Sequence, residues 1–459
     1  MPRGTGRRWR SPRVPVPERG RGSSHVQAIG THTREVDMAQ LRGYVRSIVI
    51  FVMLAILVSL PAMAEIITVS VPFVSPKGDY VTQQERYHTF RIPGMIVSQD
   101  GSVLVFAEGR RGDGSDPRRD ENAPIDLVMR RSTDDGRTWQ PMVVIESGFR
   151  PGGDLLDFAD PTPVLDAKTG TVFLFYGQMP DIAPRNMAYG QSPDSKDGNH
   201  IVWFRSSTDN GQTWSDRKQV VYPDEPHQTS DGLYWRQAEP GPGSGIQLQW
   251  QDQKRSRNGR LIIPAKRGGS RTPDGPVTVE PFVYYSDDHG KSWQVGNVTP
   301  GPDANEDEVV ELIDGRVMLD ARPESGKFRR RHISTDGGVT WGPDNPDTIP
   351  ITEVDGSLVR YSAKRAGHDR DRILFSGPRG ENGLNRNNIT VWTSYDEGKT
   401  FTNPVQLNNG FAAYSVMQRL ADGTIGMVVE TAKGAADRYG EITFYRFDLA
   451  ELEGGSRRR

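Results

Sequence analysis

Short apolar stretches, each introduced by a Gly or an Asp, recur six times along the chain. They are shorter than most helices, and their Val, Ile, Leu and Phe residues are typical of buried strands. A further candidate strand precedes each stretch, for example Gly94–Val97, Thr162–Leu165, Val309–Ile313 and Ser415–Leu420. The pattern predicts a series of hairpins. The six stretches are Gly101–Ala107, Gly170–Tyr176, Gly259–Pro264, Gly315–Asp320, Asp371–Ser376 and Gly423–Val429.

An octapeptide of the form S-x-D-x-G-x-[ST]-[WF] follows each of the first five stretches. Its Asp can accept hydrogen bonds from backbone N–H groups two residues on, its Gly takes a positive φ, and its aromatic residue folds over the turn. One copy would be ordinary turn composition, whereas five copies indicate a repeated supersecondary unit. The copies are Ser132–Trp139, Ser207–Trp214, Ser286–Trp293, Ser334–Trp341 and Ser394–Phe401.

The repeated order is strand, turn, strand, loop, strand, octapeptide, strand. The sixth unit has no octapeptide and ends with a strand at Ile442–Phe447. Six such units predict an all-β, six-bladed β-propeller with four-stranded antiparallel blades around a central channel. We expect the run Arg329–Arg331 to form a solvated strand face, because alternate side chains of a strand point outward.

This topology separates the loops between two faces. All octapeptides lie on one face, and residues just before a first strand or just after a second strand lie on the other, at the mouth of the channel. Any one charged residue at such a position is more often solvated than bound to a ligand. A group of arginines, carboxylates and a tyrosine at one rim instead predicts a binding site: Arg91, Glu108, Arg110, Asp120, Glu306, Arg322, Arg386 and Tyr414.

The residue composition excludes several kinds of site. The chain has no Cys, which excludes disulfides, a thiol nucleophile and Cys-ligated metal, and its eight His are scattered, so no metal site is expected. Removing residues 1–64 takes away ten Arg and three acidic residues and changes the net charge from −2 to −9. A mildly acidic chain of this kind is not a nucleic-acid binder by default.

The amino terminus has the pattern of a targeting segment. Residues 1–37 are rich in Arg, Gly and Pro, and Ile48–Leu60 is an apolar run that ends before Ala62-Met63-Ala64. This run of thirteen residues is shorter than the roughly 20 of a membrane span, so residues 38–64 are predicted to be a signal peptide rather than an anchor. We expect a secreted or periplasmic protein whose start is Met38 rather than Met1, with no stable membrane span after cleavage.

On its motifs, the chain resembles the exo-α-sialidases (neuraminidases) of the bacterial and animal type, which carry this octapeptide as the Asp-box. The resemblance covers about Ile66 to Leu449. It rests on F-R-I-P at Phe90–Pro93, the five octapeptides, N-E-x-x-V-V-E-L at Asn305–Leu312 with an Arg sixteen residues after its first Glu, and an Arg and a Tyr 28 residues apart. The fifth octapeptide departs from the family pattern with Phe401, and Asp320 stands where Asn is more usual.

The resemblance implies a role for each candidate residue. Three arginines, Arg91, Arg322 and Arg386, would bind the carboxylate of a sialic acid. Tyr414 would be the nucleophile and Glu306 its partner. Asp120 would be the acid/base. The same loop also holds Asp113 and Asp116, but Asp120 lies twelve residues before the first octapeptide serine and begins the sequence D-E-N-A-P-I-D, as in the family. Glu108 and Arg110 would support the site or form a structural ion pair.

The resemblance implies hydrolysis of terminal α-linked sialic acids on glycoproteins, gangliosides or oligosaccharides, with net retention and without a metal or cofactor. The catalytic domain would span residues 65–450, followed by a polar tail at 451–459. Two alternatives remain: a propeller that only binds sialoglycans, and a trans-sialidase. A transferase would need an acceptor site, for which Tyr234 and Trp235 in the insertion Tyr222–Ile246 are candidates.

Overall fold

The computed structural model describes sixteen parts of the chain. The chain divides into two compact units, Met1–Leu60 and Pro61–Arg459, and every described residue belongs to the second unit. The predicted extension at 1–37, the predicted signal peptide at 38–64 and Asp120 lie outside the described residues. The described residues are 66–78, 87–117, 123–149, 155–180, 201–220, 234–252, 255–270, 278–301, 304–324, 326, 328–347, 349, 351, 353–380, 385–434 and 437–454.

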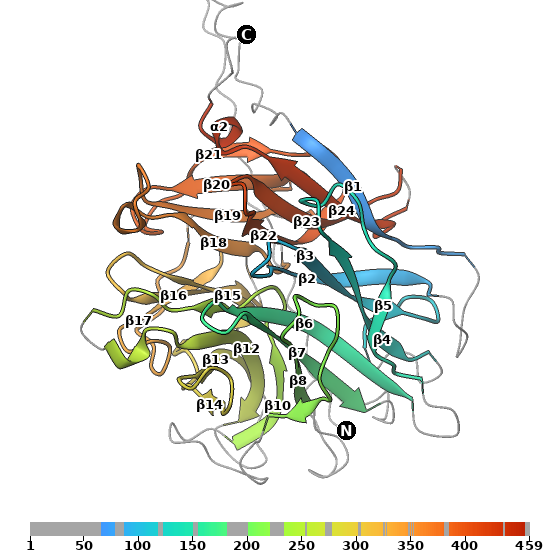
Figure 1. Ribbon diagram of the computed structural model, residues 1–459, viewed down its shortest axis with the longest axis horizontal. Coiled ribbons are helices and arrows are strands. Elements are labelled where there is room, and N and C mark those ends of the chain that lie inside the picture. Colours follow the sequence, from blue (N-terminus) through green and yellow to red (C-terminus); the bar gives the residue numbers. More distant parts are fainter. Residues whose placement is uncertain are drawn as a thin grey trace, which may run out of the picture. The chain divides into compact units, whose positions relative to one another are not determined.

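These residues form an all-β fold with five hydrogen-bonded sheets (Figure 1). The largest sheet has eight strands: β2 (Thr89–Val97), β3 (Val103–Arg110), β4 (Ile125–Ser132), β5 (Val143–Glu146), β6 (Leu156–Asp166), β7 (Thr171–Pro180), β8 (Ile201–Ser207) and β9 (Lys218–Gln219). The next sheet has five: β10 (Tyr234–Pro240), β11 (Ile246–Gln247), β12 (Leu261–Ser270), β13 (Thr278–Ser286) and β14 (Gln294–Val295).

The other three sheets are smaller. One contains β15 (Ala304–Glu311), β16 (Val317–Pro323) and β17 (Arg330–Ser334). Another contains β18 (Ser357–Ser362), β19 (Arg372–Pro378), β20 (Ile389–Ser394) and β21 (Thr402–Gln406). The last contains β22 (Ala412–Arg419), β23 (Ile425–Thr431), β24 (Glu441–Phe447) and β1 (Ile66–Val74). The helical elements of the described residues are η1 (Arg255–Arg257), η2 (Lys364–Ala366) and α2 (Leu449–Leu452).

The six apolar stretches of the sequence coincide with β3, β7, β12, β16, β19 and β23. Each is a middle strand of an antiparallel series, and alternate side chains of β3 and of β19 belong to different hydrophobic clusters. All eight residues of β3 and all seven of β19 are buried. This burial explains why the stretches are nearly continuous in apolar residues instead of alternating.

The sheets have a propeller arrangement. Strand β2 contacts β6 and β22, β15 contacts β12 and β18, β6 contacts β12, and β18 contacts β22, so these strands form a closed cycle. Figure 1 shows the sheets around a common centre. The first strand, β1, pairs antiparallel with β24 near the end of the chain. The two ends of the described chain are therefore joined in one sheet.

The hydrogen bonding differs from the predicted six separate four-stranded blades. A parallel bridge between Ile125 and Asp157 joins β4 to β6 and merges two series of strands into the eight-stranded sheet. In addition, the sheet of β15, β16 and β17 has no fourth strand among the described residues. Hydrogen bonds in these residues thus show five sheets of unequal size.

Each octapeptide folds as a closed turn that follows the third strand of a series. In the first copy, Gly136 N–H donates to Ser132 Oγ at 2.9 Å, and Thr138 N–H donates to Asp134 Oδ1 at 2.9 Å. The same pair of bonds occurs in the other four copies. The Asp thus binds the backbone four residues on, and the prediction of two residues was wrong.

The run Arg329–Arg331 is not a solvated face. Arg329 and Arg331 are buried, and both pair with the buried carboxylate of Asp320. Arg331 also pairs with Asp347. The prediction failed because both faces of this strand series are covered, so outward-pointing side chains meet a neighbouring sheet.

The end of the described chain is also folded. Within the predicted tail, Leu452 is buried at the end of α2, and Glu453 accepts a hydrogen bond from Arg372 at 2.7 Å.

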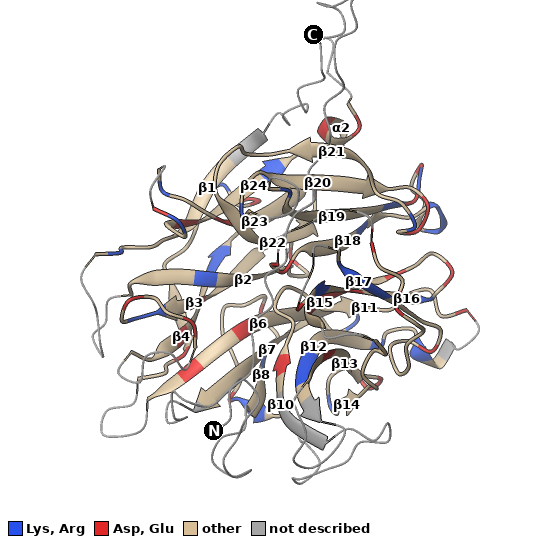
Figure 2. Cartoon of the chain, turned by 180° about the vertical axis from the view of Figure 1, so that it is seen from behind, with Lys and Arg blue, Asp and Glu red and all other residues tan. Residues whose placement is uncertain are grey.

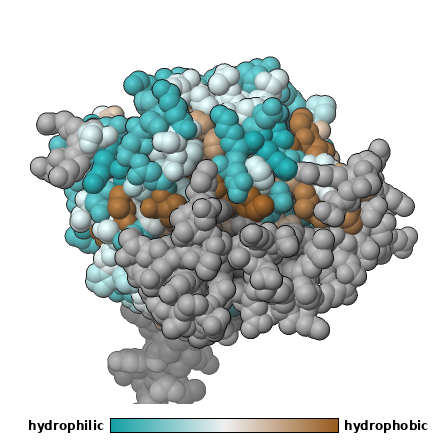
Figure 3. Space-filling model, turned by 90° about the horizontal axis from the view of Figure 1, so that it is seen from below, coloured by the Kyte–Doolittle hydropathy of each residue, from teal (hydrophilic) through white to brown (hydrophobic). Residues whose placement is uncertain are grey.

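Among the described residues, no helix has the length and apolarity to cross a membrane. In Figure 3 the coloured surface is mostly hydrophilic, with hydrophobic residues in small separate patches.

Candidate active site

Irregular pairing at one end of the innermost strands places the candidate residues. The register shifts between Arg91 and Gly94 in β2, and between Ala304 and Asp307 in β15. A third shift lies between Ala412 and Ser415 in β22, beside Tyr414. A bulge of this kind redirects a side chain out of the regular alternation of a strand. Arg91, Glu306 and Tyr414 each lie at or within such a bulge. Figure 2 shows a basic stretch on β2 and acidic stretches on β6.

Tyr414 and Glu306 form the shortest contact of the group. Tyr414 Oη donates to Glu306 Oε1 at 2.5 Å, although the two residues are 108 positions apart. Arg322 Nη1 donates to Glu306 Oε2 at 2.8 Å and to Tyr414 Oη at 3.3 Å. Tyr414 and Glu306 are both buried. The arrangement joins a phenol, a carboxylate and a guanidinium in one network.

The environment moves the pKa values of this pair apart. Burial and the negative charge of Glu306 raise the pKa of Tyr414 well above 10, against the opposing effect of nearby arginines. Burial alone would raise the pKa of Glu306, but the charges of Arg322 and Lys266 and the hydrogen bond from Tyr414 lower it overall. Glu306 is therefore an ionised acceptor for the phenolic proton.

Three arginines surround Tyr414, and we name Arg91, Arg322 and Arg386 the arginine clamp. Arg91 Cζ lies 5.6 Å and Arg386 Cζ 5.8 Å from the centroid of the Tyr414 ring. The buried Nε of Arg322 has no hydrogen-bond partner among the described residues. Three guanidinium groups around one phenol form a group of cationic donors that is suited to binding an anion.

Glu108 and Arg110 form a buried ion pair beside the clamp. Arg110 Nη2 lies 2.6 Å from Glu108 Oε2, and Arg110 Nη1 lies 2.7 Å from Asp116 Oδ1. The same Asp116 oxygen is 3.9 Å from Arg91 Nη1. Burial raises the pKa of Glu108, against the charge of Arg110. The pair thus links the loop after β3 to the clamp.

Several residues that hold the site together carry no signal in the sequence. Glu430 on β23 is fully buried and accepts hydrogen bonds from Arg91 Nε at 2.6 Å and from Ile92 N–H at 2.7 Å. Lys266 on β12 lies 2.7 Å from Asp160 Oδ2. Asp160 has a φ of 56°, at the register shift in β6. Only the fold brings these charges together, and no spacing along the chain marks them.

A second group of buried acids lies next to Glu306 on β15. Burial and the charge of Asp355 raise the pKa of Asp307 and of Glu308 well above their ordinary values. Arg329 lies 3.6 Å from Asp355 and opposes this effect. Among the described residues, no group of three or more His, Asp and Glu side chains is arranged to hold a metal ion. The raised pKa values favour the protonated, uncharged forms of Asp307 and Glu308 beside Glu306.

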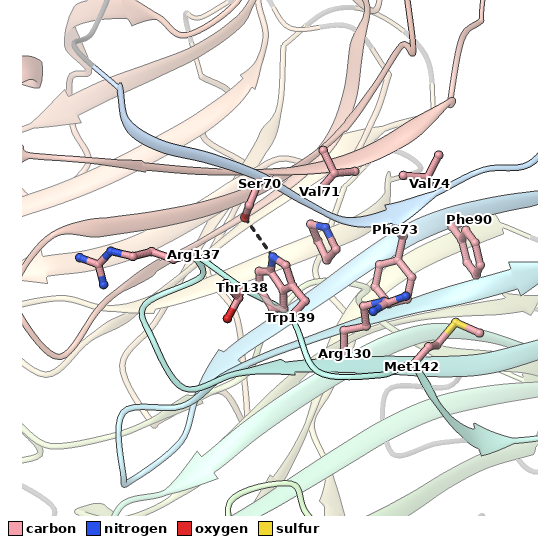
Figure 4. Close-up of a pocket in the computed structure, with 11 residues that line it drawn as sticks. Ser70, Val71, Phe73, Val74, Phe90, Arg130, Arg137, Thr138, Trp139 and Met142 are labelled. Atoms are coloured by element: carbon pink, nitrogen blue, oxygen red, sulfur yellow. Dashed lines mark hydrogen bonds between the residues drawn. The ribbon is translucent and has the colours of Figure 1, made fainter.

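A cavity of about 480 Å³ lies elsewhere, between β1 and the first octapeptide. Figure 4 shows Trp139, Phe73 and Arg130 around it, and Trp139 Nε1 donates to Ser70 Oγ at 2.9 Å. None of the seven candidate residues that the structure describes lines this cavity. The side chains of Tyr234 and Trp235, the suggested acceptor residues, lie outside the described parts.

The chain is similar to known proteins over most of its length. Residues 101–427 match the family described as BNR repeat-like domain. A sialidase of Micromonospora viridifaciens is 32% identical over 385 residues, which are 82% of this chain and 54% of that protein. A sialidase of Paraclostridium sordellii is 30% identical over 66% of this chain and 70% of its own length. The chain spans 54% and 60% of the first two curated relatives, the second being a sialidase of Bacteroides fragilis.

Solved structures give the same result. The Hadza microbial sialidase Hz136 superposes with a TM-score of 0.64 and 25% identity, over 79% of this chain and 66% of that one. An intramolecular trans-sialidase of Ruminococcus gnavus has a TM-score of 0.62 over 83% of this chain and 98% of that one, and at 21% identity it supports the fold alone. Together with the family match, these findings show that the chain belongs to the sialidase family with BNR repeats.

Proposed function

We propose that this chain is an exo-α-sialidase that hydrolyses terminal α-linked sialic acids with net retention. One observation carries the proposal: Tyr414 Oη lies 2.5 Å from Glu306 Oε1, inside the arginine clamp. A planar guanidinium can hold a carboxylate with two parallel hydrogen bonds. A sialic acid has its carboxylate on the anomeric carbon, so the clamp would place that carbon beside Tyr414.

A neutral nucleophile suits this substrate. Most retaining glycosidases attack with a carboxylate, and the sugar carboxylate would repel one, whereas a phenol avoids this repulsion; sialidases with a Tyr nucleophile are the known exception. The raised pKa of Tyr414 means that a base must take its proton. In the proposed step, Glu306 Oε1 accepts the phenolic proton as Tyr414 Oη bonds to the anomeric carbon and the glycosidic bond breaks.

The remaining proton transfers are assigned to Asp120. It would protonate the departing glycosidic oxygen and then take a proton from the water that cleaves the sugar–tyrosine bond, while Glu306 returns its proton to Tyr414 Oη. This assignment rests on the family resemblance, because Asp120 lies outside the described residues. The Tyr414–Glu306 pair favours an enzyme over a glycan-binding propeller, since binding would need only the arginines. Sialylated glycoproteins, gangliosides and oligosaccharides are the proposed substrates.

We also propose that the fold is a six-bladed propeller. The eight-stranded sheet contains two antiparallel series, β2 to β5 and β6 to β9, joined through the parallel bridge of Ile125 and Asp157. Counting these as two blades gives six series in the closed cycle of strands. The pairing of β1 with β24 supports this count, because it completes a four-stranded series at the point of closure.

The predicted targeting segment leads to a further proposal, that the protein is exported and cleaved after Ala64. Amino-terminal sequencing of protein collected outside the cytoplasm is expected to begin at Glu65 or a near neighbour. A start upstream of Ile48 in the exported protein would contradict it.

Direct assay tests the proposed activity. Residues 65–459 incubated with a fluorogenic α-sialoside should release the fluorophore, while the matching galactoside and fucoside should stay intact. Proton NMR of the first product should show the α-anomer of the free sugar, as retention requires. Turnover of the neutral glycosides but not of the sialoside would contradict the proposal.

A further inference from the structure

Two arginines of the clamp meet at one tyrosine, Tyr439, which lies in the connection between β23 and β24. Arg386 Nη1 donates a hydrogen bond to Tyr439 Oη at 2.7 Å. Arg91 Cζ lies 3.9 Å from the centroid of the same ring. A ring face attracts a guanidinium, and a phenolic oxygen fixes the direction of a planar donor. One side chain therefore contacts both arginines, through two different parts of its structure.

Arg386 differs from the other two arginines in its partners. Arg91 is paired with Glu430 and Arg322 with Glu306. No described carboxylate forms an ion pair with Arg386, whose Nη2 donates to the backbone oxygen of Glu353 at 3.0 Å. A carboxylate partner would offset part of the guanidinium charge, whereas a phenol and a carbonyl orient it without neutralising it. Arg386 thus keeps its charge for a ligand.

The position of Tyr439 is fixed by its surroundings. Its φ of 59° is in the left-handed region, which is unfavourable by about 1 kcal/mol for a residue with a side chain. The turn is held by a hydrogen bond from Gly440 N–H to the Asp437 oxygen at 3.1 Å, and by one from Ser75 N–H to the Gly440 oxygen at 2.8 Å. The ring packs edge-on against Phe411, with centroids 4.7 Å apart. A strained conformation kept by several contacts indicates a defined role.

We propose that Tyr439 is a positioning residue that sets the directions of Arg91 and Arg386, and thereby determines how strongly the pocket prefers an anionic sugar over its neutral analogue. The inference rests on the proposed function, because it takes a carboxylated sugar as the ligand. Tyr439 acts through the arginines. It sets carboxylate affinity, while the chemical step belongs to Tyr414 and Glu306.

The test separates the ring from the hydroxyl. Tyr439→Phe keeps the ring under Arg91 and removes the acceptor for Arg386, and Tyr439→Leu removes both. The matched control is Tyr361→Phe, since Tyr361 Oη donates to the Gly423 oxygen at 2.6 Å and touches no arginine of the clamp. Inhibition constants are measured for an unsaturated sialic acid analogue and for its uncharged methyl ester, together with KM and kcat on a fluorogenic sialoside.

We expect Tyr439→Phe to weaken binding of the acid about tenfold and Tyr439→Leu about fiftyfold, as for the loss of one and two orienting contacts. Affinity for the ester should stay within about twofold of the wild-type value. KM should rise in parallel with the inhibition constant of the acid, and kcat should change by less than about threefold. The Tyr361→Phe control should match the wild type in all four values.

Three outcomes would overturn the inference. Unchanged binding of the acid in Tyr439→Phe would do so, and so would an equal loss for acid and ester, which a general distortion of the pocket would cause. If the wild type neither binds the acid nor cleaves the sialoside, the proposed function fails and this inference with it. If the wild type is active and Tyr439→Phe behaves like it, this inference alone fails. Should Tyr439→Leu not fold, the Phe variant decides.

Discussion

The octapeptides and the candidate active site are built in opposite ways. Every octapeptide closes through hydrogen bonds between residues no more than four positions apart, such as Ser132 with Gly136 and Asp134 with Thr138. The site instead depends on pairs that are far apart in the chain: Tyr414 and Glu306 are 108 positions apart, and Arg91 and Glu430 are 339. The conformation of each octapeptide is therefore determined by residues close in the chain, whereas the site is assembled by the fold.

The two regions also differ in burial. The octapeptide bonds of Asp134 and Thr138 lie at an exposed surface, so water competes with them. Glu306, Tyr414 and Arg91 are buried, and charges in such surroundings interact strongly and are costly to leave unpaired. Changes at the site should therefore alter activity strongly, and changes in an octapeptide should alter stability alone.

The largest expected effect is the loss of the proposed nucleophile. Tyr414→Phe removes the attacking oxygen but keeps the ring between Arg91 and Arg386, so kcat should fall by at least about 10³-fold. Binding of a sialic acid analogue, measured by calorimetry, should change by less than about fivefold. Wild-type kcat in this variant would refute the assigned role and remove the contrast between the two regions.

Loss of the proposed base should have the next largest effect. Glu306→Gln keeps an acceptor for Tyr414 Oη but removes the negative charge, and kcat should fall about 10²-fold. A matched control is Glu324→Gln on the loop after β16, which should keep wild-type kcat. An equal loss in both variants would show that the region is merely sensitive to charge.

The pH profile adds a separate test of Glu306. Its pKa lies below the usual 4.5 because Arg322, Lys266 and Tyr414 outweigh the effect of burial. The base is therefore ionised above this pKa and protonated below it, so kcat/KM should persist down to about pH 4.5 and fall below that value. The fall should be shallower in Glu306→Gln, which has no carboxyl group at this position to titrate.

The sequence predicted the repeated strands because their signal is local. Runs such as Gly101–Ala107 became the buried middle strands, and the positions before and after them placed Arg91, Glu306 and Tyr414 at one end. It could not predict the hydrogen bond of Arg386 to Tyr439 or the ion pair of Arg91 with Glu430, because each needs the relative position of two sheets. Such contacts leave no spacing in the chain.

Substituting an octapeptide glycine tests whether the octapeptides contribute to stability and not to activity. A Cβ on Gly136 would lie 2.1 Å from the Phe444 ring of the adjoining sheet, at a φ of 79°. The control Gly367→Ala has a similar φ of 88° and nothing within 4 Å. Gly136→Ala should lower the free energy of unfolding by about 2 kcal/mol more than the control, through overpacking, while kcat of the folded protein stays unchanged. Equal denaturation midpoints for Gly136→Ala and Gly367→Ala would show that packing of the octapeptide against the next sheet does not contribute to stability.

The same glycine contact explains a limit of the sequence analysis. The octapeptide pattern predicted a positive φ, which holds for Gly136, Gly211 and Gly290. Gly136 abuts Phe444, Gly211 abuts Leu104 and Gly290 abuts Phe173, each in a neighbouring series of strands. The glycine is thus needed for space as well as for conformation. The motif alone shows only the second requirement.

The smallest expected effect concerns acid stability at an octapeptide. Hydrogen bonds from the Thr213 side chain and backbone lower the pKa of Asp209 to about 2. Because the folded value lies below the ordinary one of 3.8, the carboxylate stabilises the fold above about pH 4, and this contribution disappears as the pH falls toward 2. Urea unfolding of Asp209→Asn should therefore show less dependence on pH in this interval than the wild type, with Asp314→Asn in an exposed turn as control. Since water competes at this surface, the change in the free energy of unfolding should be well below that of Gly136→Ala. A larger change would mean that the octapeptide carboxylates act as a coupled set rather than as separate local turns.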